Sequence, residues 1–315
     1  MLQIRSVEDL DECADLWAKI WPQLCIFDLW QVRSTFANCF GRKPYFLVAE
    51  TGGEIQGLLA LSWIEETQSY GFFPGETWQG KTWLEQNKIP SNSAQVMNAL
   101  LESVSGPMHL RYLDPECVPK ECYLMAIDEV GYLFIPSRYG FSFAGYMEEF
   151  SGKTRKKIRK EMDVLQKNGV SYRHNHFSDI ELMYEMNLEG FGAYSYFSDP
   201  RFLDSYEKLV SWLISKNMLR VTTVLLGQKV AAVDIGTVWN DGYAVLAGGT
   251  NREFPGVAKM INLHHIQWAC EECLGFVDFL CGDFNWKKRF HLSSRPLFEI
   301  QRQSGSSLQA KIAQN

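Results

Sequence analysis

Hydrophobic and polar residues follow two kinds of pattern along this chain, one typical of helices and one typical of strands. Apolar positions recur every three or four residues in residues 7–20 and 26–40, which predicts two helices. Residues 45–50 and 55–63 are short apolar runs separated by a Gly-Gly turn. A pair of such runs predicts a β-hairpin.

The same order of elements returns in the second half of the chain. Residues 178–188 and 200–216 have helical periodicity, and residues 219–226 and 229–239 are apolar runs joined by a short turn that contains glycine. Helix, helix and hairpin therefore occur twice. This order indicates an internal duplication of one α+β unit.

Past the second hairpin, residues 242–249 and 276–281 predict two further strands, and the residues from 256 to 274 predict a long helix between them. Where a glycine-containing turn leads into a helix, unpaired backbone N–H groups and the positive end of the helix dipole face outward together. Two small residues, Gly256 and Ala258, would let a diphosphate approach the backbone closely. The pattern predicts an anion site at the start of this helix.

The composition is ordinary for a folded chain, with 46% hydrophobic and 22% charged residues. The net charge of −6 argues against a general nucleic-acid-binding protein. Residues 152–169, however, carry seven basic and two acidic side chains, and Ile158, Met162 and Leu165 recur there at helical spacing. We expect an amphipathic helix whose bases either form a solvated face or meet an anionic partner.

No apolar run approaches the roughly 18–20 residues that cross a bilayer, so we expect no membrane span. The segment MLQIRSVEDLDE becomes acidic where a secretory signal would be apolar. We therefore expect a cytoplasmic protein whose eight cysteines are reduced thiols. Neither Cys270 and Cys273 nor Cys117 and Cys122 have the glycine-containing knuckle typical of zinc sites, so no metal is expected.

Two stretches carry a resemblance to a known family: SGKTRKKIRKEMDVLQKNGV at residues 151–170 and FPGVAKMINLHHIQWACEECLGFVDFLCGDFNWKKRF at residues 254–290. With the order of elements, they resemble the GNAT acyltransferase superfamily, in the tandem-GNAT branch of CelD-like acetyltransferases and Fem-type ligases. The resemblance implies an α+β fold, an α/β/α sandwich of two GNAT-like domains related by internal duplication, with mixed central sheets.

The resemblance also implies a division of roles along the chain. Residues 1–150 would form a degenerate GNAT-like domain that shapes the acceptor cleft. Residues 151–302 would form the acyl-CoA-binding domain, which begins with the basic helix. Residues 303–315 would be a flexible tail.

The implied co-substrate is acetyl-CoA or another acyl-CoA. Its diphosphate would lie on the backbone at the start of the long helix, and its thioester carbonyl would lie against backbone N–H groups at the end of the strand 242–249. The residues expected to bind it are Gly248, Arg252, Gly256, Val257, Ala258 and Lys259. Two positions depart from the family pattern: Glu253 replaces a Gln or Arg, and Trp286 replaces the Tyr of a Tyr-Lys pair.

Three residues are candidates for proton transfer. Asp234, inside the apolar run AAVDIGTVW, is suited to be a general base, or else pairs with a basic residue across the strand. Tyr243 precedes the strand where acyl chemistry is expected and is a candidate acid, or else packs in the core. Asp283 follows the last strand, where it could hold substrate or water. We expect His264 and His265 to have core or surface roles.

Four residues are candidates for binding the acceptor: Trp78, Trp83, Asn285 and Lys287. The two tryptophans flank GETWQGKT, residues 75–82, which satisfies the Walker A pattern. A nucleotide-binding loop needs a long helix after its lysine, but the segment that follows Lys81 is polar and reaches Pro90 within two turns. We interpret the segment as an aromatic loop that lines the substrate cleft between the halves.

The predicted function is transfer of an acyl group from acyl-CoA to an amine, by direct attack within a ternary complex. The acceptor would be a small molecule or a cell-envelope precursor. Two alternatives stay open. One is a Fem-type transferase that uses aminoacyl-tRNA, with the basic helix binding phosphates. The other is a non-catalytic module whose CoA site has decayed.

Overall fold

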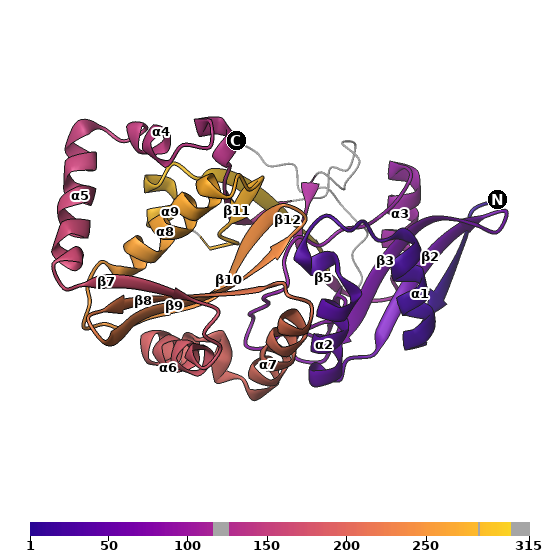
Figure 1. Ribbon diagram of the computed structural model, residues 1–315. Coiled ribbons are helices and arrows are strands. Elements are labelled where there is room, and N and C mark those ends of the chain that lie inside the picture. The colour runs from indigo at the N-terminus through magenta and orange to yellow at the C-terminus, as the bar shows by residue number, and fades with distance from the viewer. Residues whose placement is uncertain (116–125, 283, 304–315) are drawn as a thin grey trace. The chain divides into compact units, whose positions relative to one another are not determined.

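Figure 1 shows the computed structural model of the chain, which describes residues 1–115, 126–282 and 284–303. By its internal contacts the chain divides into two units. Unit 1 contains residues 1–130, 201–209 and those from 296 on, and unit 2 contains residues 131–200 and 210–295. The roles predicted for residues 1–150, 151–302 and 303–315 stay predictions.

Unit 1 is built on a mixed β-sheet with the strand order β1, β2, β3, β4, β5 and β12. Neighbouring strands are antiparallel except β4 and β5, which are parallel. The bounds are β1 Gln3–Val7, β2 Pro44–Thr51, β3 Glu54–Ile64, β4 Ser69–Phe72, β5 Met108–Leu113 and β12 Ser293–Arg302.

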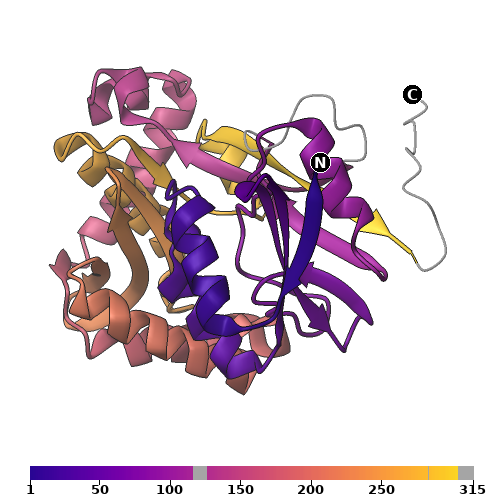
Figure 2. The ribbon, with the colours of Figure 1, turned by 90° about the vertical axis from the view of Figure 1, so that its right-hand side faces the viewer.

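Helices cover both faces of this sheet because the side chains of β2 and β3 alternate between the faces. Phe46 and Val48 belong to the core cluster that includes α1 and α2, whereas Leu47 and Ala49 belong to the cluster that includes α3. The helices are α1 Leu10–Ile20, α2 Trp30–Phe40 and α3 Ala94–Glu102. Figure 2 gives a second view, with β1 and α1 in indigo.

Unit 2 is built on the remaining strands of the mixed sheet, in the order β6, β11, β10, β9, β8 and β7. Only β10 and β11 are parallel to one another. The bounds are β6 Ala126–Phe134, β7 Val170–His174, β8 Leu219–Leu226, β9 Lys229–Trp239, β10 Gly242–Thr250 and β11 Phe276–Asp278.

In unit 2 the helices also lie on both faces of the sheet. One face packs on α8 through a cluster that includes Val224, Leu226, Met260 and Ile261, and α6 covers the other face (Figure 1). The helices are α4 Phe143–Glu148, α5 Gly152–Gln166, α6 Asp179–Phe191, α7 Pro200–Ser215, α8 Val257–Glu271 and α9 Asn285–Arg289, of which α7 crosses the boundary between the units.

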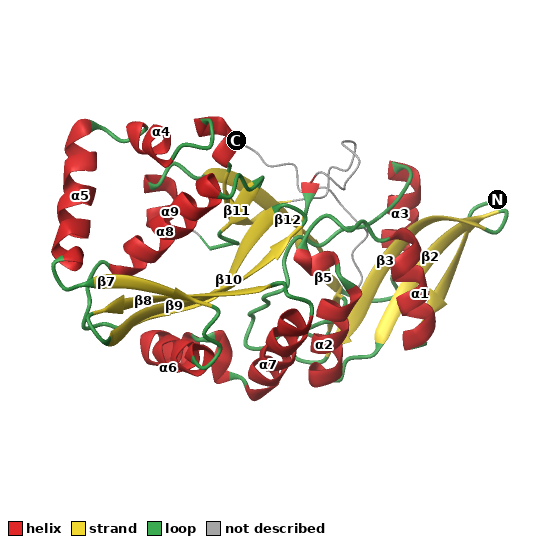
Figure 3. Ribbon diagram, in the orientation of Figure 1, coloured by secondary structure: helices red, strands yellow, loops and turns green. Residues whose placement is uncertain are grey.

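The two units share one topology, which can be followed in Figure 3. In each, a first strand is followed by two helices, three antiparallel strands, a helix and a strand parallel to its neighbour. The sixth strand of each sheet comes from the other half of the sequence: β12 pairs with β5, and β6 pairs with β11. The α+β sandwich of two duplicated units is therefore confirmed.

The predicted helices and both hairpins are present, and residues 152–166 form the predicted amphipathic helix. The predicted strand 276–281 ends earlier, at Asp278. The sequence analysis did not predict β1, β5, β6, β7, β12 or α3. From residue 304 on, the predicted tail lies outside the described residues. None of the described helices is long and apolar enough to cross a bilayer.

Candidate functional site

In unit 2, β10 and β11 are neighbours for only part of their length. Their parallel register joins residues 242–244 to residues 276–278, while β10 continues to Thr250 with β9 as its partner. The register between β10 and β9 shifts between Val245 and Ala247, directly after the last residue of β10 that pairs with β11. β10 therefore runs past the carboxyl end of its parallel neighbour β11, and this divergence of the two strands, called the opening below, is the kind of position at which open α/β sheets bind their ligands.

The turn that follows β10 leads directly into α8. Gly256 is the N-cap residue, with φ +94°, a conformation that favours glycine. Val257 is buried and donates its N–H to the Phe254 carbonyl, 3.2 Å away. Gly256 and Ala258 are exposed, and within the described chain no backbone acceptor is found for their N–H groups. These donors and the helix dipole together favour an anion.

The charged side chains around this turn already have partners. Arg252 donates from Nη2 to the Gly190 carbonyl at 2.9 Å. Lys259 pairs with Glu161 of α5. Glu253, which departs from the family pattern, pairs with Lys229 at 3.0 Å and is exposed. The acidic residue is thus neutralised by a neighbour, and an anion at the turn would rely on backbone N–H groups.

Gly248 of β10 lies opposite Asp234 of β9. Asp234 Oδ2 is 2.9 Å from Nε2 of His265 in α8, and the two residues are 6% and 0% exposed. A Cβ at Gly248 would lie 2.1 Å from Asp234 Oδ1, so the carboxylate packs directly on the backbone of β10. A buried carboxylate–imidazole pair therefore supports the part of β10 where the thioester is expected.

Residues 152–288, which contain all of these features, match the family model described as "Acetyltransferase (GNAT) domain". This segment is therefore similar to GNAT acetyltransferase domains. The resemblance predicted from the sequence is confirmed. No curated protein matches the chain.

Solved structures similar to the whole chain share its fold at low sequence identity. FemX is 10% identical, with a TM-score of 0.59, and the match covers 95% of this chain and 97% of FemX. A conserved protein of unknown function from Bacteroides thetaiotaomicron VPI-5482 is 11% identical, with coverages of 96% and 100% and a TM-score of 0.59. The C-terminal domain of a putative lysylphosphatidylglycerol synthetase from Agrobacterium fabrum is 10% identical, with coverages of 87% and 87% and a TM-score of 0.52.

Tyr243 lies in the core of unit 2. Its ring centroid is 5.2 Å from that of His265 and 5.2 Å from that of Trp268. Gly236 makes room for the ring, since a Cβ there would lie 2.3 Å from a ring carbon. Burial and the Asp234 carboxylate raise the pKa of Tyr243 above its ordinary value. The hydroxyl therefore keeps its proton, and the assignment of Tyr243 as an acid stays a prediction.

Lys287 lies in α9 and is 2% exposed. Its Nζ donates to the carbonyl oxygens of Phe279, Leu280 and Cys281, each 2.9 Å away. This side chain holds the segment after β11 in place and does not reach solvent. Because its ammonium group already donates to three carbonyl oxygens, it has little capacity for the substrate contact predicted from the sequence. Asn285 is exposed at the start of α9, and Asp283 lies outside the described residues.

The two tryptophans expected to line the acceptor cleft are buried in unit 1. Trp78 packs on Phe40 and Phe202, and the Trp83 ring lies 5.5 Å from that of Phe36. Their exposed fractions are 2% and 9%. Both belong to an aromatic core, and a role in binding the acceptor stays a prediction.

The Walker-like residues 75–82 form a turn that closes on itself. Trp78 and Lys81 exchange backbone hydrogen bonds of 3.1 and 2.8 Å. Glu76 Oε1 accepts from the Thr82 hydroxyl and from the N–H groups of Trp83 and Leu84. Residues 81–92 contain no helix. The segment lacks the helix that a nucleotide-binding loop requires, in agreement with its interpretation as an aromatic loop.

The basic helix α5 presents its charges to solvent. Ser151 caps it by accepting from the Thr154 N–H, and Ile158 and Leu165 bury its other side. One open face of this helix is formed by Gly152, Arg155, Lys156, Arg159, Lys160 and Asp163. The residues of this face recur three and four apart, as expected for one side of a helix.

Sequence reasoning missed the role of His265, which has a buried partner in Asp234. The signal that could have found this pair is a histidine among apolar helix residues in a chain that also has a carboxylate inside an apolar strand. Cys270 is buried and Cys273 is exposed, while Cys117 and Cys122 lie outside the described residues. Among the side chains that the structure describes, no group of three or more could hold a metal.

Proposed function

We propose that this chain transfers an acyl group, in the simplest case acetyl, from acyl-CoA to an amine. The observation that carries the proposal is the opening between β10 and β11, which is followed by the Gly256 turn within a segment that matches an acetyltransferase domain. The turn supplies unpaired backbone donors for a diphosphate, and the opening is where β10 continues past its pairing with β11.

The donor would lie along the second half of β10. Its diphosphate would meet the N–H groups of Gly256 and Ala258, while Val257, whose N–H donates to the Phe254 carbonyl, anchors the turn in the core. Arg252 and Lys259 would reach the phosphates only by giving up their present partners, Gly190 and Glu161. The thioester carbonyl would accept from the backbone near Gly248, which stabilises the oxyanion of the tetrahedral intermediate.

In the reaction, the amine nitrogen attacks the thioester carbon, the carbon–sulfur bond breaks, and the thiolate takes up a proton. We assign the pair Asp234 and His265 as the base that accepts the amine proton, because it is the polar pair packed against Gly248. Tyr243, predicted from the sequence as the acid, keeps its proton and is our candidate donor to the thiolate, although its raised pKa makes it a weak acid. Asp283 keeps its predicted role of holding substrate or water.

The acceptor class follows from the neighbours in fold. FemX and a putative lysylphosphatidylglycerol synthetase share this fold over most of the chain. We propose an amine on a cell-envelope precursor or a related small molecule as the acceptor. Asn285, exposed at the start of α9, is a candidate contact for it, whereas Lys287 is buried and would act only by holding the segment after β11 in place.

Binding of acetyl-CoA to the purified chain, measured by calorimetry and by thermal shift, tests the donor site. A ligand at one hundred times its Kd stabilises the fold by about 2.7 kcal/mol. Gly256→Glu places a carboxylate where the diphosphate is expected, and we expect at least a tenfold loss of affinity. Gly53→Glu is the matched control, because Gly53 has φ +83° and open space around it. Equal affinity in both variants would place the donor elsewhere.

A Fem-type transferase that uses aminoacyl-tRNA is the second candidate, and the exposed basic face of α5 favours it. Phosphate contacts make affinity fall steeply with salt. Charge reversal in K156E/K160E is expected to abolish tRNA binding and to leave acetyl-CoA binding intact. If the chain binds tRNA in a salt-dependent way and no CoA ester, this candidate replaces the first. If it binds neither, the chain is a non-catalytic module.

A further inference from the structure

Unit 1 contains a pocket at the position that corresponds to the opening in unit 2. Its volume is about 140 Å³, and it lies between β4 and β5, the parallel pair of this unit, which meet only at Tyr70 and Met108. The loop after β4, with the Walker-like residues, closes one side. The polar side chains that line it are Arg33, Thr67, Ser69, Glu76, Thr77, Thr82, Asn87, His109 and Arg111.

Glu76 gives the pocket a buried carboxylate. The residue is 3% exposed, and its Oε1 accepts from the Thr82 hydroxyl at 2.6 Å and from two backbone N–H groups at 3.1 and 2.8 Å. Within the described residues, all hydrogen bonds of this carboxylate fall on Oε1. Burial raises the pKa of Glu76, with these hydrogen bonds acting against it. Oε2 is therefore left for a ligand, and a cationic or hydrogen-bond-donating group would stabilise it.

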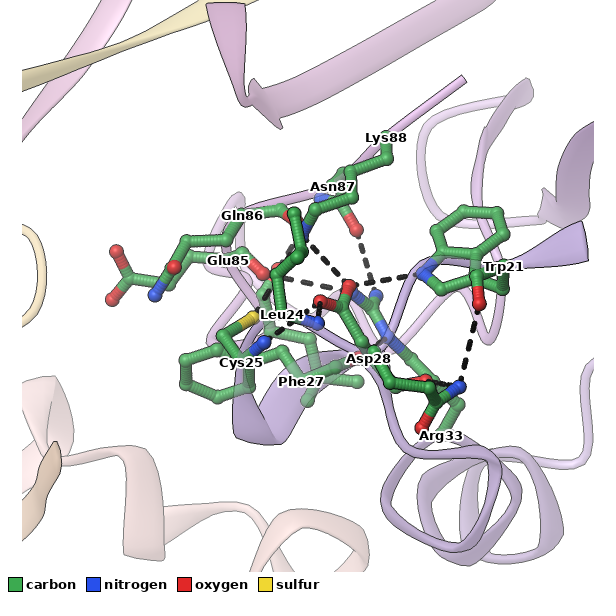
Figure 4. A network of polar contacts seen from close by, with 12 residues as sticks. Trp21, Leu24, Cys25, Phe27, Asp28, Arg33, Glu85, Gln86, Asn87 and Lys88 are labelled. Atoms are coloured by element: carbon green, nitrogen blue, oxygen red, sulfur yellow. Dashed lines mark hydrogen bonds and ion pairs between the residues drawn. The ribbon is translucent and has the colours of Figure 1, made fainter. Parts of the chain in front are cut away.

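Arg33 gives the same pocket a buried cation. Its Nε donates to the Phe27 carbonyl at 2.7 Å, and its Nη1 donates to the side chain of Asn87 at 2.7 Å and to the Phe73 carbonyl at 3.2 Å (Figure 4). Nη2 has only a long contact, 3.5 Å, to the Glu85 carbonyl. No ion pair of Arg33 is found within the described residues. The guanidinium is held in place by neutral groups and keeps a donor on Nη2.

The other charged groups of the pocket are already paired. Arg111 makes a two-pronged contact with Asp128, from Nε at 3.0 Å and from Nη2 at 2.8 Å. His109 Nε2 is 2.6 Å from Glu299. Glu76 and Arg33 are therefore the two charges of the pocket that make no contact ion pair among the described residues, although each is near enough to shift the pKa of the other. Each would gain from a ligand group of the opposite charge.

We propose that this pocket binds a small zwitterion, an amino acid, with its ammonium group at Glu76 Oε2 and its carboxylate at Arg33 Nη2. A buried charge is stable only when it is paired or well hydrogen-bonded, and an amino acid offers both signs within one small molecule. A water occupies roughly 10–15 Å³ on this measure, so about 140 Å³ admits about ten non-hydrogen atoms. We do not expect a phosphate in this pocket, because the negative charge of Glu76 lies on the loop that a phosphate would have to contact.

Calorimetry with glycine, L-alanine, L-serine and the larger L-amino acids tests the proposal on the full chain. Propionate and ethylamine each carry one of the two charges of alanine and serve as paired controls. We expect at least one small amino acid to bind and each single-charge analogue to bind at least tenfold more weakly. If no amino acid binds at millimolar concentration, the pocket holds water only and the proposal fails. Equal binding of propionate or ethylamine overturns it as well.

Glu76→Gln keeps an oxygen that can accept the loop hydrogen bonds and removes the charge, so we expect at least a tenfold loss of affinity for the amino acid. Glu54→Gln, on the exposed start of β3, is the matched control with unchanged affinity. If Glu76→Gln does not fold, Thr77→Phe fills the pocket from its half-buried rim and is expected to abolish binding. Unchanged affinity in either pocket variant would rule out this site.

Discussion

The ammonium group of Lys88 and the carboxylate of Asp28 lie 2.7 Å apart, and both side chains are buried (Figure 4). The carboxylate also accepts from Trp21 Nε1 and from the N–H groups of Leu24 and Cys25, each at 2.9 Å. The substitution Lys88→Met therefore leaves a carboxylate that keeps three donors. Asp28→Asn leaves a buried ammonium group without its counter-charge and turns an amide N–H₂ toward groups that are themselves donors.

These differences set the expected magnitudes. Removing one partner of a buried pair costs about 3–5 kcal/mol, and we expect this loss for Asp28→Asn. Lys88→Met should cost about 1.5–3 kcal/mol, the worth of a hydrogen bond to a charged group. For a unit of this size, about 1 kcal/mol shifts Tm by roughly 2–4 °C, so Asp28→Asn is expected to lower it by roughly 6–20 °C. The double variant should cost less than the two single losses added together.

Thermal and urea unfolding, followed by tryptophan fluorescence, measures these losses. Trp17 and Trp21 are stacked at 3.7 Å beside the pair and report on unit 1. The exposed pair of Lys208 and Asp204, also 2.7 Å apart, is the control. Removing that pair should cost less than about 1 kcal/mol. The reasoning is refuted if Lys88→Met costs as much as Asp28→Asn, or if neither exceeds the control.

Three further predictions concern other parts of the chain. Gly248→Ala drives a methyl group into the carboxylate beneath it, and we expect a loss of about 1–3 kcal/mol in urea unfolding; a neutral result would mean that β10 is not packed as described. Lys81→Ala should leave the response to ATP–Mg²⁺ in thermal shift unchanged, and loss of an ATP response would restore the nucleotide-binding reading. Burial raises the pKa of Asp179, but hydrogen bonds, foremost from Arg173, outweigh it and hold the pKa below its ordinary value. The stabilisation is present above the unfolded pKa of about 3.9 and is lost as the pH falls through the lower folded value. In Arg173→Met, stability measured from pH 7 to pH 2 should therefore fall less steeply at the acid end, and an unchanged slope would contradict the pairing.

The elements that could be predicted from the sequence are those whose burial leaves a local pattern. Both hairpins are apolar on both faces, because helices cover each side of the sheets, and their turns contain glycine. By contrast, β1 and β7 are only five residues long, and their exposed and half-buried residues do not alternate regularly, so they show too little periodicity to be predicted from the sequence. The exchange of β6 and β12 depends on pairing between distant segments, which a single sequence does not reveal.

The candidate site was predicted in part for the same reason. A glycine turn before a long helix is a local signal, and the structure places Gly256 at the helix N-cap. The burial of Lys287 on three carbonyl groups depends on how the segment after β11 folds back, which its charged, exposed-looking sequence does not suggest. The partnership of Asp234 with His265 likewise depends on the packing of a helix on a sheet.

Because β6 and β12 are exchanged between the two halves of the sequence, the sheet of each unit can be completed only at a certain stage of translation. When a ribosome has made residues 1–150, unit 1 has every strand of its sheet except β12, and the edge of β5 stays unpaired until residues 293–302 emerge. An open strand edge attracts other chains, so the nascent first half should need protection during most of translation. Conversely, two separately expressed fragments, cut near residue 150, each hold the strand that the other lacks, and mixing them should restore the fold.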